Sequence, residues 1–165
     1  SDTPNQKWAT DVTEFNVSGN KLYLSPIIDL FNGEIVSFDL SERPVFSQII
    51  RMLKKSFRKV KSTQNIILHS DQGWQYQMKR YQRQLRDQGL TPSMSRKGNC
   101  WDNACIESFF GTLKSECFHR QEFASVKELE ITVKEYIDYY NNERIKVKLE
   151  GLSPIQYREK YFKNR

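Results

Sequence analysis

Two turn signals near the start of the chain constrain its fold more than any other feature. Ser18-Gly19-Asn20 is rich in turn-forming residues, and Asn32-Gly33 is a strong signal for a β-hairpin. The segments on either side of these turns are rich in β-branched and aromatic residues, which favour strands. The sequence therefore predicts three consecutive antiparallel strands, at 8–15, 21–31 and 34–40.

The chain then changes to alternating helical and strand-type segments. Apolar residues recur at helical spacing over 44–58, and a short apolar run at 65–69 suits a buried parallel strand. A polar helix at 77–88 precedes a last strand at 90–95. This order predicts an α/β fold with a five-stranded mixed sheet, three antiparallel strands followed by two parallel ones, flanked by helices.

Further helices are expected after the last strand. An amphipathic helix carries Glu107 beside its apolar stripe, and Asp102 or Asn99 is a candidate for its N-cap. A helical stripe runs from 126 to 141 with Ser125 as the expected cap. Ser153, followed by proline, marks the start of a terminal helix.

Composition sets the outer limits of the interpretation. At 165 residues and 38% hydrophobic content, the chain suits one domain, 1–165, with a substantial core. A net charge of +6 favours a polyanionic partner without establishing one. Three cysteines without a metal-type pair and only two histidines argue against a structural zinc site and for a reducing compartment. Without a membrane-length apolar run or a signal peptide, a cytoplasmic location is expected.

Three acidic residues stand out by their context. Asp11 lies inside the first strand, among residues that favour sheets. Asp71 follows the buried strand at 65–69, and sites in open α/β sheets collect at the carboxyl ends of strands. Glu107 lies near the edge of the apolar stripe of its helix. Taken alone, each acid has an ordinary explanation as an edge residue, a turn former or a solvated glutamate.

Convergence of these three acids would have a chemical consequence. Clustered carboxylates repel one another unless cations neutralise them, and oxygen ligands select Mg²⁺ or Mn²⁺ over zinc. Two such ions, about 4 Å apart, can bind both the attacking and the leaving oxygen of an in-line phosphoryl displacement. No covalent enzyme intermediate is then required.

The spacing of the acids and the motifs around them resemble a known superfamily. Asp11 and Asp71 are separated by 59 residues, and Asp71 and Glu107 by 35. This order resembles the DDE transposases and retroviral integrases, and specifically the catalytic core of a bacterial insertion-sequence transposase. The motifs that carry the resemblance are WATDVT at 8–13, HSDQGWQY at 69–76, DNACIESFF at 102–110, LKSE at 113–116, YYNNER at 139–144 and GLSP at 151–154.

The resemblance implies a ribonuclease-H-like fold and a specific activity. Asp11, Asp71 and Glu107 match the catalytic triad that binds two Mg²⁺ or Mn²⁺ ions. Water would attack at the end of the element, and the freed 3′-hydroxyl would attack a second phosphodiester. The implied enzyme is a DDE-type polynucleotidyl transferase that mobilises an insertion sequence by DNA cleavage and strand transfer.

Other positions match family residues close to DNA. Lys114 matches a basic residue that holds terminal DNA, and its ordinary explanation is a surface lysine paired with an acid. Arg144 matches the arginine after the Tyr-Asn pair. Family members often continue with a histidine motif, but Lys146 stands in that part of this chain, so no histidine role carries over. The loop and helix start contribute Ser95, Lys97, Gly98, Asn99 and Asn103.

The implied partners are DNA, at the element ends and the target, and further copies of the chain, because two ends must be synapsed. No helix-turn-helix pattern precedes Trp8, so a separate N-terminal or partner-encoded segment is expected to recognise the terminal repeats. DNA contacts should be mostly to phosphates and salt-sensitive. The bound protein would be associated with the nucleoid.

Two other functions are compatible with these features. A ribonuclease-H-like nuclease would cleave nucleic acid without joining it, and a non-catalytic assembly module would bind DNA without metal. Asp102 and Asp29 are further acids near the triad, for which structural roles are favoured. Because a polar, glycine-containing loop precedes its helix, Glu107 is expected to stand away from the two aspartates until metal and DNA draw it in.

Overall fold

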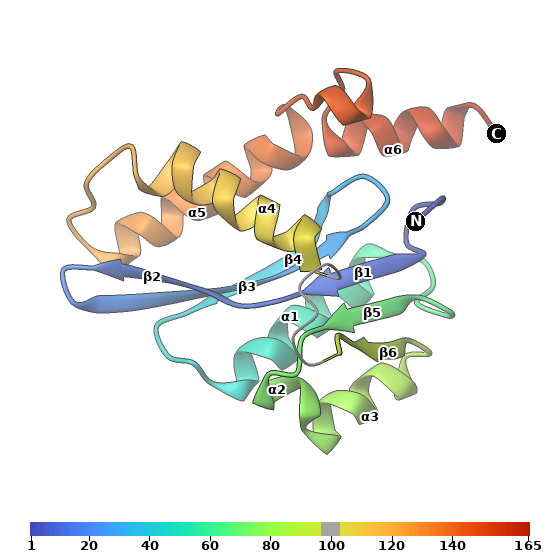
Figure 1. Cartoon of the computed structure of the whole chain (residues 1–165), viewed down its shortest axis with the longest axis horizontal. Helices are drawn as coiled ribbons and strands as arrows, with labels where there is room; N and C mark the ends of the chain where they lie inside the picture. The colour runs from blue at the N-terminus through green and yellow to red at the C-terminus, as the bar shows by residue number, and fades with distance from the viewer. Residues whose placement is uncertain (97–102) are drawn as a thin grey trace.

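The computed structural model describes residues 1–96 and 103–165. One mixed sheet forms its centre, with helices packed on both faces (Figure 1). The antiparallel strands are β1 (Lys7–Thr10), β2 (Thr13–Val17), β3 (Asn20–Asp29) and β4 (Ile35–Ser41), and the parallel additions are β5 (Ile67–Ser70) and β6 (Thr91–Met94). The predicted α/β class and mixed sheet are confirmed.

The prediction of five strands is wrong by one, because the segment at 8–15 forms two strands. β1 ends at Thr10 and β2 begins at Thr13, so Asp11 lies between them. The backbone N–H of Val12 donates to the Asp11 carboxylate at 2.8 Å instead of to a neighbouring strand. β1 then pairs with β3 and β5, whereas β2 pairs with β3 alone.

The β3–β4 hairpin forms where the Asn-Gly pair predicts it. Gly33 has a φ of +77°, and its N–H donates to the Asp29 carbonyl at 2.8 Å. The Asp29 N–H donates to the carbonyl of Glu34 at 2.8 Å, which closes the loop. The Asn32 side chain donates to the Pro154 carbonyl at 2.8 Å and so joins the hairpin to the last helix.

The helices follow the predicted order. They are α1 (Phe46–Lys59), α2 (Trp74–Gln77), α3 (Lys79–Asp87), α4 (Ala104–Leu113), α5 (Val126–Asn142) and α6 (Pro154–Lys163). A π-helical turn, Lys114–Phe118, continues α4, and a 3-10 turn, Val147–Leu149, precedes α6. None of the helices in the described ranges is both long and apolar enough to span a bilayer.

Two details of the helices differ from the expectation and two agree with it. The helix predicted at 77–88 starts earlier and is split into α2 and α3, because Met78 has an extended backbone with ψ of 133°. Ser125 caps α5, and Ser153 forms a capping box with Gln156 at the start of α6, as predicted. Asn103 occupies the N-cap position of α4, whereas the candidates Asp102 and Asn99 lie outside the described residues.

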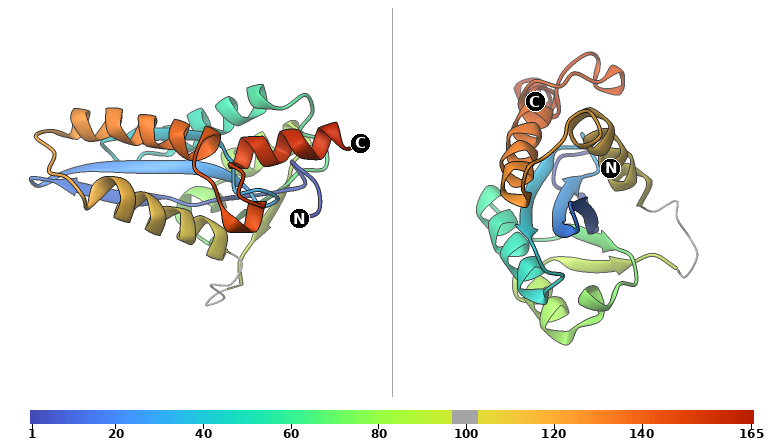
Figure 2. Two further views of the ribbon diagram at one scale, coloured as in Figure 1. Left: turned by 90° about the horizontal axis from the view of Figure 1, so that it is seen from above. Right: turned by 90° about the vertical axis from the view of Figure 1, so that its left-hand side faces the viewer.

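The sheet separates two apolar cores, and neighbouring residues of β1 point into different ones. Ala9 packs with α4 and α5, whereas Trp8 packs with α1 and α3. Figure 2 shows these helices on either side of the sheet. The predicted stripe of α4 lies in the first core: Ile106, Phe109, Phe110 and Leu113, with Cys117 in the turn that follows.

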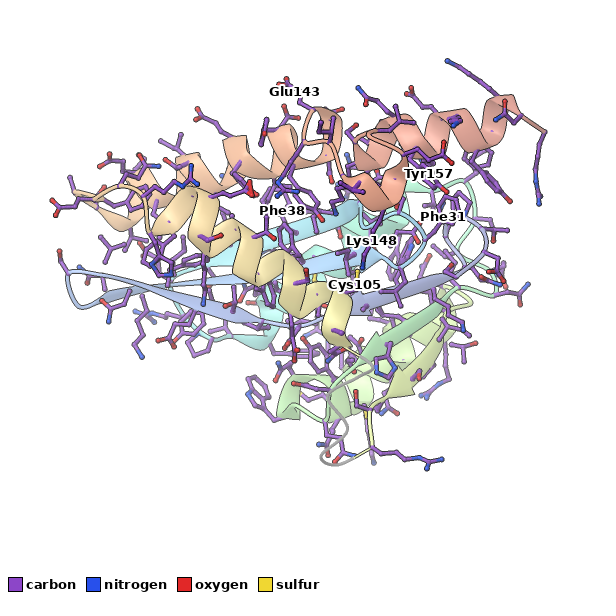
Figure 3. All side chains as sticks on the ribbon, turned by 45° about the horizontal axis from the view of Figure 1, so that its top comes forward. Phe31, Phe38, Cys105, Glu143, Lys148 and Tyr157 are labelled. Atoms are coloured by element: carbon purple, nitrogen blue, oxygen red, sulfur yellow. The ribbon has the colours of Figure 1, made fainter. Side chains whose placement is uncertain are left out.

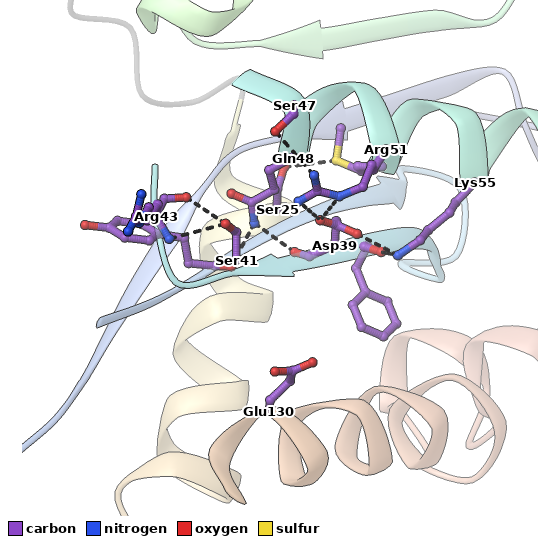
Figure 4. Close-up of polar contacts among 12 residues, drawn as sticks. Ser25, Asp39, Ser41, Arg43, Ser47, Gln48, Arg51, Lys55 and Glu130 are labelled. Atoms are coloured by element: carbon purple, nitrogen blue, oxygen red, sulfur yellow. Dashed lines mark hydrogen bonds and ion pairs between the residues drawn. The ribbon is translucent and has the colours of Figure 1, made fainter. Parts of the chain in front are cut away.

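Ion pairs hold part of the basic face of α1 against the edge strand β4. The buried Asp39 carboxylate accepts from Lys55 at 2.7 Å and from the Nε of Arg51 at 3.1 Å (Figure 4). The Gln48 side chain donates to the carbonyls of Asp39 and Tyr23. Arg51 and Lys55 therefore attach α1 to the sheet.

Candidate active site

Two adjacent parallel strands bring Asp11 and Asp71 to the same edge of the sheet. β1 pairs with β5 in a register that sets Ala9 opposite His69. Continued by two residues, this register sets Asp11 opposite Asp71, just beyond the carboxyl ends of both strands. The two aspartates therefore lie side by side, where sites in α/β sheets form.

Backbone N–H groups orient both aspartates. The Asp11 carboxylate accepts from Val12, and Oδ1 of Asp71 accepts from the N–H of Gly73 at 2.7 Å. A Cβ at position 73 would lie only 2.9 Å from Oδ1 of Asp71, so glycine permits this close approach. Each carboxylate is fixed by one short bond and keeps further lone pairs for other ligands.

Glu107 joins the aspartates electrostatically from a different element. Its neighbour Ile106 is buried in the first core, which anchors α4 against the sheet, while Glu107 itself is exposed. Burial, opposed by the hydrogen bond from Val12 and assisted by the negative charges of Asp71 and Glu107, raises the pKa of Asp11 to about 6. The three predicted acids therefore interact electrostatically at Asp11. A neighbouring cation would stabilise the charged form of Asp11.

The three carboxylates are suitable ligands for a hard divalent ion, although they are not close enough together to bind one in this arrangement. Three carboxylates supply only oxygen ligands, as Mg²⁺ and Mn²⁺ prefer. Within residues 1–96 and 103–165, no three His, Cys, Asp or Glu side chains are arranged closely enough to hold a metal ion as they stand. The expectation that Glu107 moves toward the aspartates with metal and DNA stays a prediction.

A hydrogen-bond network beneath Asp71 joins β5 to β6, and the sequence interpretation did not assign it. The His69 ring nitrogens contact the hydroxyl oxygens of Ser93 and Ser95 at 3.0 and 2.9 Å. The Ser95 N–H donates to the Ser70 carbonyl at 2.9 Å. Ser95, matched above to a loop near DNA, is buried here and fixes the strand end that carries Asp71. The histidine two residues before Asp71 was the available signal.

The residues predicted to contact DNA occupy different surroundings. The Lys114 ammonium lies 5.4 Å from the centre of the Phe15 ring. Asn103 is buried, and its Oδ1 has no hydrogen-bond donor in the part of the chain described. Arg144 binds Glu116 through two nitrogens, at 2.8 and 2.6 Å. Lys97, with Gly98 and Asn99, lies outside the described residues.

Asp29 has the structural role favoured for it. Its side chain is buried at the end of β3 and accepts from the N–H groups of Asn5 and Phe31 at 2.8 and 2.9 Å. Burial raises its pKa to about 6. These bonds hold the start of the chain and the hairpin loop together.

A ribonuclease-H-like sheet with paired aspartates at its carboxyl edge and a glutamate on the adjoining helix defines the integrase class of catalytic core. An integrase core domain model matches residues 1–100, and a second model of the same description matches 107–162. The chain belongs to the integrase core domain family.

Named relatives agree with this assignment. The chain is 58% identical over 159 residues to the putative transposase InsK for insertion sequence element IS150 of Escherichia coli (strain K12), covering 96% of this chain and 56% of that protein. An uncharacterized transposase-like protein of Haemophilus influenzae is 56% identical over 94% of this chain and 71% of its own. The chain spans about half the length of the InsK and InsF transposases that it matches.

Solved structures confirm the fold. The HTLV-2 integrase catalytic core domain in complex with magnesium superposes with a TM-score of 0.77 at 15% identity, covering 94% of this chain and 97% of that one. The catalytic core domain of BIV integrase gives a TM-score of 0.68 at 14% identity, covering 98% and 99%.

Proposed function

We propose that this chain, 1–165, is a single catalytic domain of an insertion-sequence transposase that cleaves DNA and transfers strands with Mg²⁺ or Mn²⁺. Asp11, Asp71 and Glu107 are the proposed metal ligands. The observation that carries the proposal is the β1–β5 register, which brings Asp11 beside Asp71 while the charge of Glu107 acts on Asp11. The transposase names of its relatives support the same activity.

Each of the proposed metal ligands is positioned by a different part of the chain. When bound, two divalent ions supply neutralising charge for the attacking and leaving oxygens of the phosphodiester. Asp11 and Asp71 are held in place for these ions by Val12 and Gly73. Glu107 completes the ligand set from α4, whose buried stripe fixes the helix to the sheet. Pre-oriented ligands of this kind lower the cost of reaching the reactive geometry.

The proposed partners are DNA and further copies of the chain. Lys114, Lys97, Asn103 and Arg144 are the proposed DNA contacts. A similar fold occurs in a chain of the simian T-cell lymphotropic virus intasome, with a TM-score of 0.73 at 17% identity. We propose that this chain too works as an oligomer on DNA, with a separate segment that recognises the terminal repeats, in the bacterial cytoplasm at the nucleoid.

The activity is tested by joining an oligonucleotide duplex with a free 3′-hydroxyl to a supercoiled plasmid, in Mg²⁺ or Mn²⁺. The change Glu107→Gln keeps the size of the side chain but removes its charge. Loss of a group that only supports a metal ligand typically lowers activity by about 10- to 100-fold. Glu107→Gln should lower the joining rate by more than this, because Glu107 is itself a proposed ligand. Glu130→Gln, at a partly exposed glutamate of α5, serves as the control and should leave the rate unchanged.

Joining by Glu107→Gln at the wild-type rate would refute the assignment. Cleavage of the plasmid without joining, by the wild-type protein, would favour the ribonuclease-H-like nuclease instead. DNA binding that is indifferent to metal, with neither reaction, would favour the assembly module.

A further inference from the structure

A polar cavity lies on another face of the helix that carries Glu107. Its volume is about 740 Å³, and three distant segments line it: the hairpin loop 30–33, one side of α4, and the connection 144–149 between α5 and α6. On α4 the lining residues include Cys105, Ser108 and Thr112, which recur at helical spacing. Ser108 lies about 100° round the helix from Glu107. Figure 3 shows Cys105 on α4, with Lys148 and Tyr157 close by.

The charge of this cavity is one-sided. Among the described residues, its lining contains Arg144, Lys146 and Lys148 and no aspartate or glutamate. Glu116 neutralises Arg144. The two lysines form no ion pair with a carboxylate among the residues that the structure describes, so their positive charge is directed at whatever enters the cavity.

Lys146 is held in the cavity by neutral groups. Its ammonium donates to the hydroxyl of Tyr140 and lies 4.3 Å from the centre of that ring. A Cβ on Gly33 would lie 2.9 Å from this ammonium, so the glycine of the hairpin makes room for it. Burial, with the nearby charges of Arg144 and Lys148, lowers the pKa of Lys146 to about 8. A half-buried ammonium without a carboxylate partner is costly, and a bound anion would relieve this cost.

The connection that supplies these lysines is rigid. An isolated bridge pairs Lys146 with Leu152, and the N–H groups of Leu149 and Gly151 both donate to the Lys146 carbonyl at 3.0 Å. The backbone that carries the two lysines is therefore held in place. Phe31 and Tyr157, whose ring centres are 5.5 Å apart, line another part of the cavity. Aromatic side chains beside cations favour a nucleotide, because a sugar or base can pack on the rings while the phosphate meets the lysines.

We propose that this cavity binds a backbone phosphate of DNA through Lys146 and Lys148, so that α4 contacts DNA on two faces. The proposal rests on the proposed function, since it concerns the same substrate. Lys146 lies in the part of the chain where family members often have a histidine motif. In this proposal, the lysine at that position has the function of binding a phosphate.

The test measures DNA binding without catalysis. The full chain is titrated against a fluorescein-labelled duplex in EDTA at several NaCl concentrations, and the slope of log Kd against log salt is compared among variants. Lys148→Gln, at an exposed residue, should lower the slope by about 0.9 and weaken binding about five- to tenfold at 0.1 M NaCl. Lys146→Gln should do the same if its melting curve shows a folded protein. Lys54→Gln, exposed on α1, removes the same charge elsewhere and should change the slope less.

The outcomes separate the alternatives. Equal slopes for Lys148→Gln and Lys54→Gln would overturn the proposal, whether or not Lys146→Gln folds. Inorganic phosphate is titrated in a parallel arm, with the Lys146 and Lys148 ammonium signals followed by NMR. Shifts caused by inorganic phosphate but not by the duplex would show a free-anion site and also overturn the DNA assignment. Because no metal is present, a failure of strand transfer leaves these results unaffected.

Discussion

Arg144, which follows α5, forms an ion pair with Glu116 in the π-helical turn that continues α4. Two guanidinium nitrogens bind the carboxylate, and the Tyr136 hydroxyl donates to it at 3.1 Å. Both side chains are only 27% exposed, so solvent screens the pair less than an ordinary surface pair. This geometry gives Arg144 a structural role in addition to its proposed contact with DNA.

Glu116→Gln tests the structural role. We expect it to lower the free energy of unfolding by about 1–2 kcal/mol, because the arginine and tyrosine lose a charged acceptor. Urea unfolding measures the change. Glu130→Gln, which breaks an exposed pair with Lys134, is the matched control and should cost less than about 0.5 kcal/mol. Equal stability of the two variants would show that this half-buried pair stabilises the fold no more than an exposed one.

Asp29 makes a second prediction at this scale, for the dependence of stability on pH. Burial is the main cause of its raised pKa of about 6, with the Glu34 carboxylate adding to it and Arg158 opposing it. The folded carboxyl keeps its proton at a pH where the unfolded carboxyl has lost it. The folded state is therefore favoured at low pH, and this stabilisation is lost as the pH rises through about 6.

Between pH 4 and pH 7.5, Asp29 should contribute a loss of about 2 kcal/mol in the free energy of unfolding. Asp11 titrates in the same direction, so Asp29→Asn is compared with the wild type across the same range. The variant is expected to be less stable at low pH, because an amide cannot accept both backbone N–H groups as well, and to show a flatter profile. A profile parallel to that of the wild type would contradict the assignment to Asp29.

At the scale of elements, the sequence predicted the order and type of nearly every strand and helix. The incorrect predictions have one cause in common. The pattern of apolar residues does not reveal a local change in backbone conformation. Trp8, Val12 and Phe15 continue a strand pattern across Asp11, although the Asp11 carboxylate captures the Val12 N–H. Met78 separates α2 from α3 without any glycine or proline to announce it.

Only some features of the candidate site and its surroundings could be inferred from the sequence. Asp11, Asp71 and Glu107 could be proposed as a site because their spacing and the motifs around them are visible in the sequence. The surroundings of Lys146 could not be inferred, because they depend on the connection 146–152 folding back against Gly33, more than a hundred residues earlier. Contacts of that range leave no periodicity in the sequence.

The β3–β4 hairpin allows this long-range contact to be measured. Gly19 and Gly33 both have positive φ, but a Cβ on Gly19 would meet open space, whereas one on Gly33 would meet Lys146. Alanine at either position should cost about 1 kcal/mol for its backbone conformation. Gly33→Ala should cost about 1 kcal/mol more, because Lys146 must leave the Tyr140 hydroxyl. Urea unfolding compares the two variants, and equal losses would show that Lys146 is not held there.

At the scale of the whole molecule, one sheet serves both stability and chemistry. Its two faces bury separate cores, and its carboxyl edge carries the aspartates between them. α4 links the two functions, since its buried stripe closes one core, the charge of Glu107 acts on Asp11, and another face borders the basic cavity. A change in the packing of α4 would therefore reach both the proposed metal ligands and the proposed phosphate site.

The central claim is that Asp11 and Asp71 form the floor of a divalent metal site. Crystals of the chain soaked in MnCl₂ test it through anomalous difference density collected near the manganese absorption edge. We predict a peak between the Asp11 and Asp71 carboxylates in the wild-type protein and its loss in Asp71→Asn. A fully soaked wild-type crystal without a peak there, or a peak that persists unchanged in Asp71→Asn, would contradict the account.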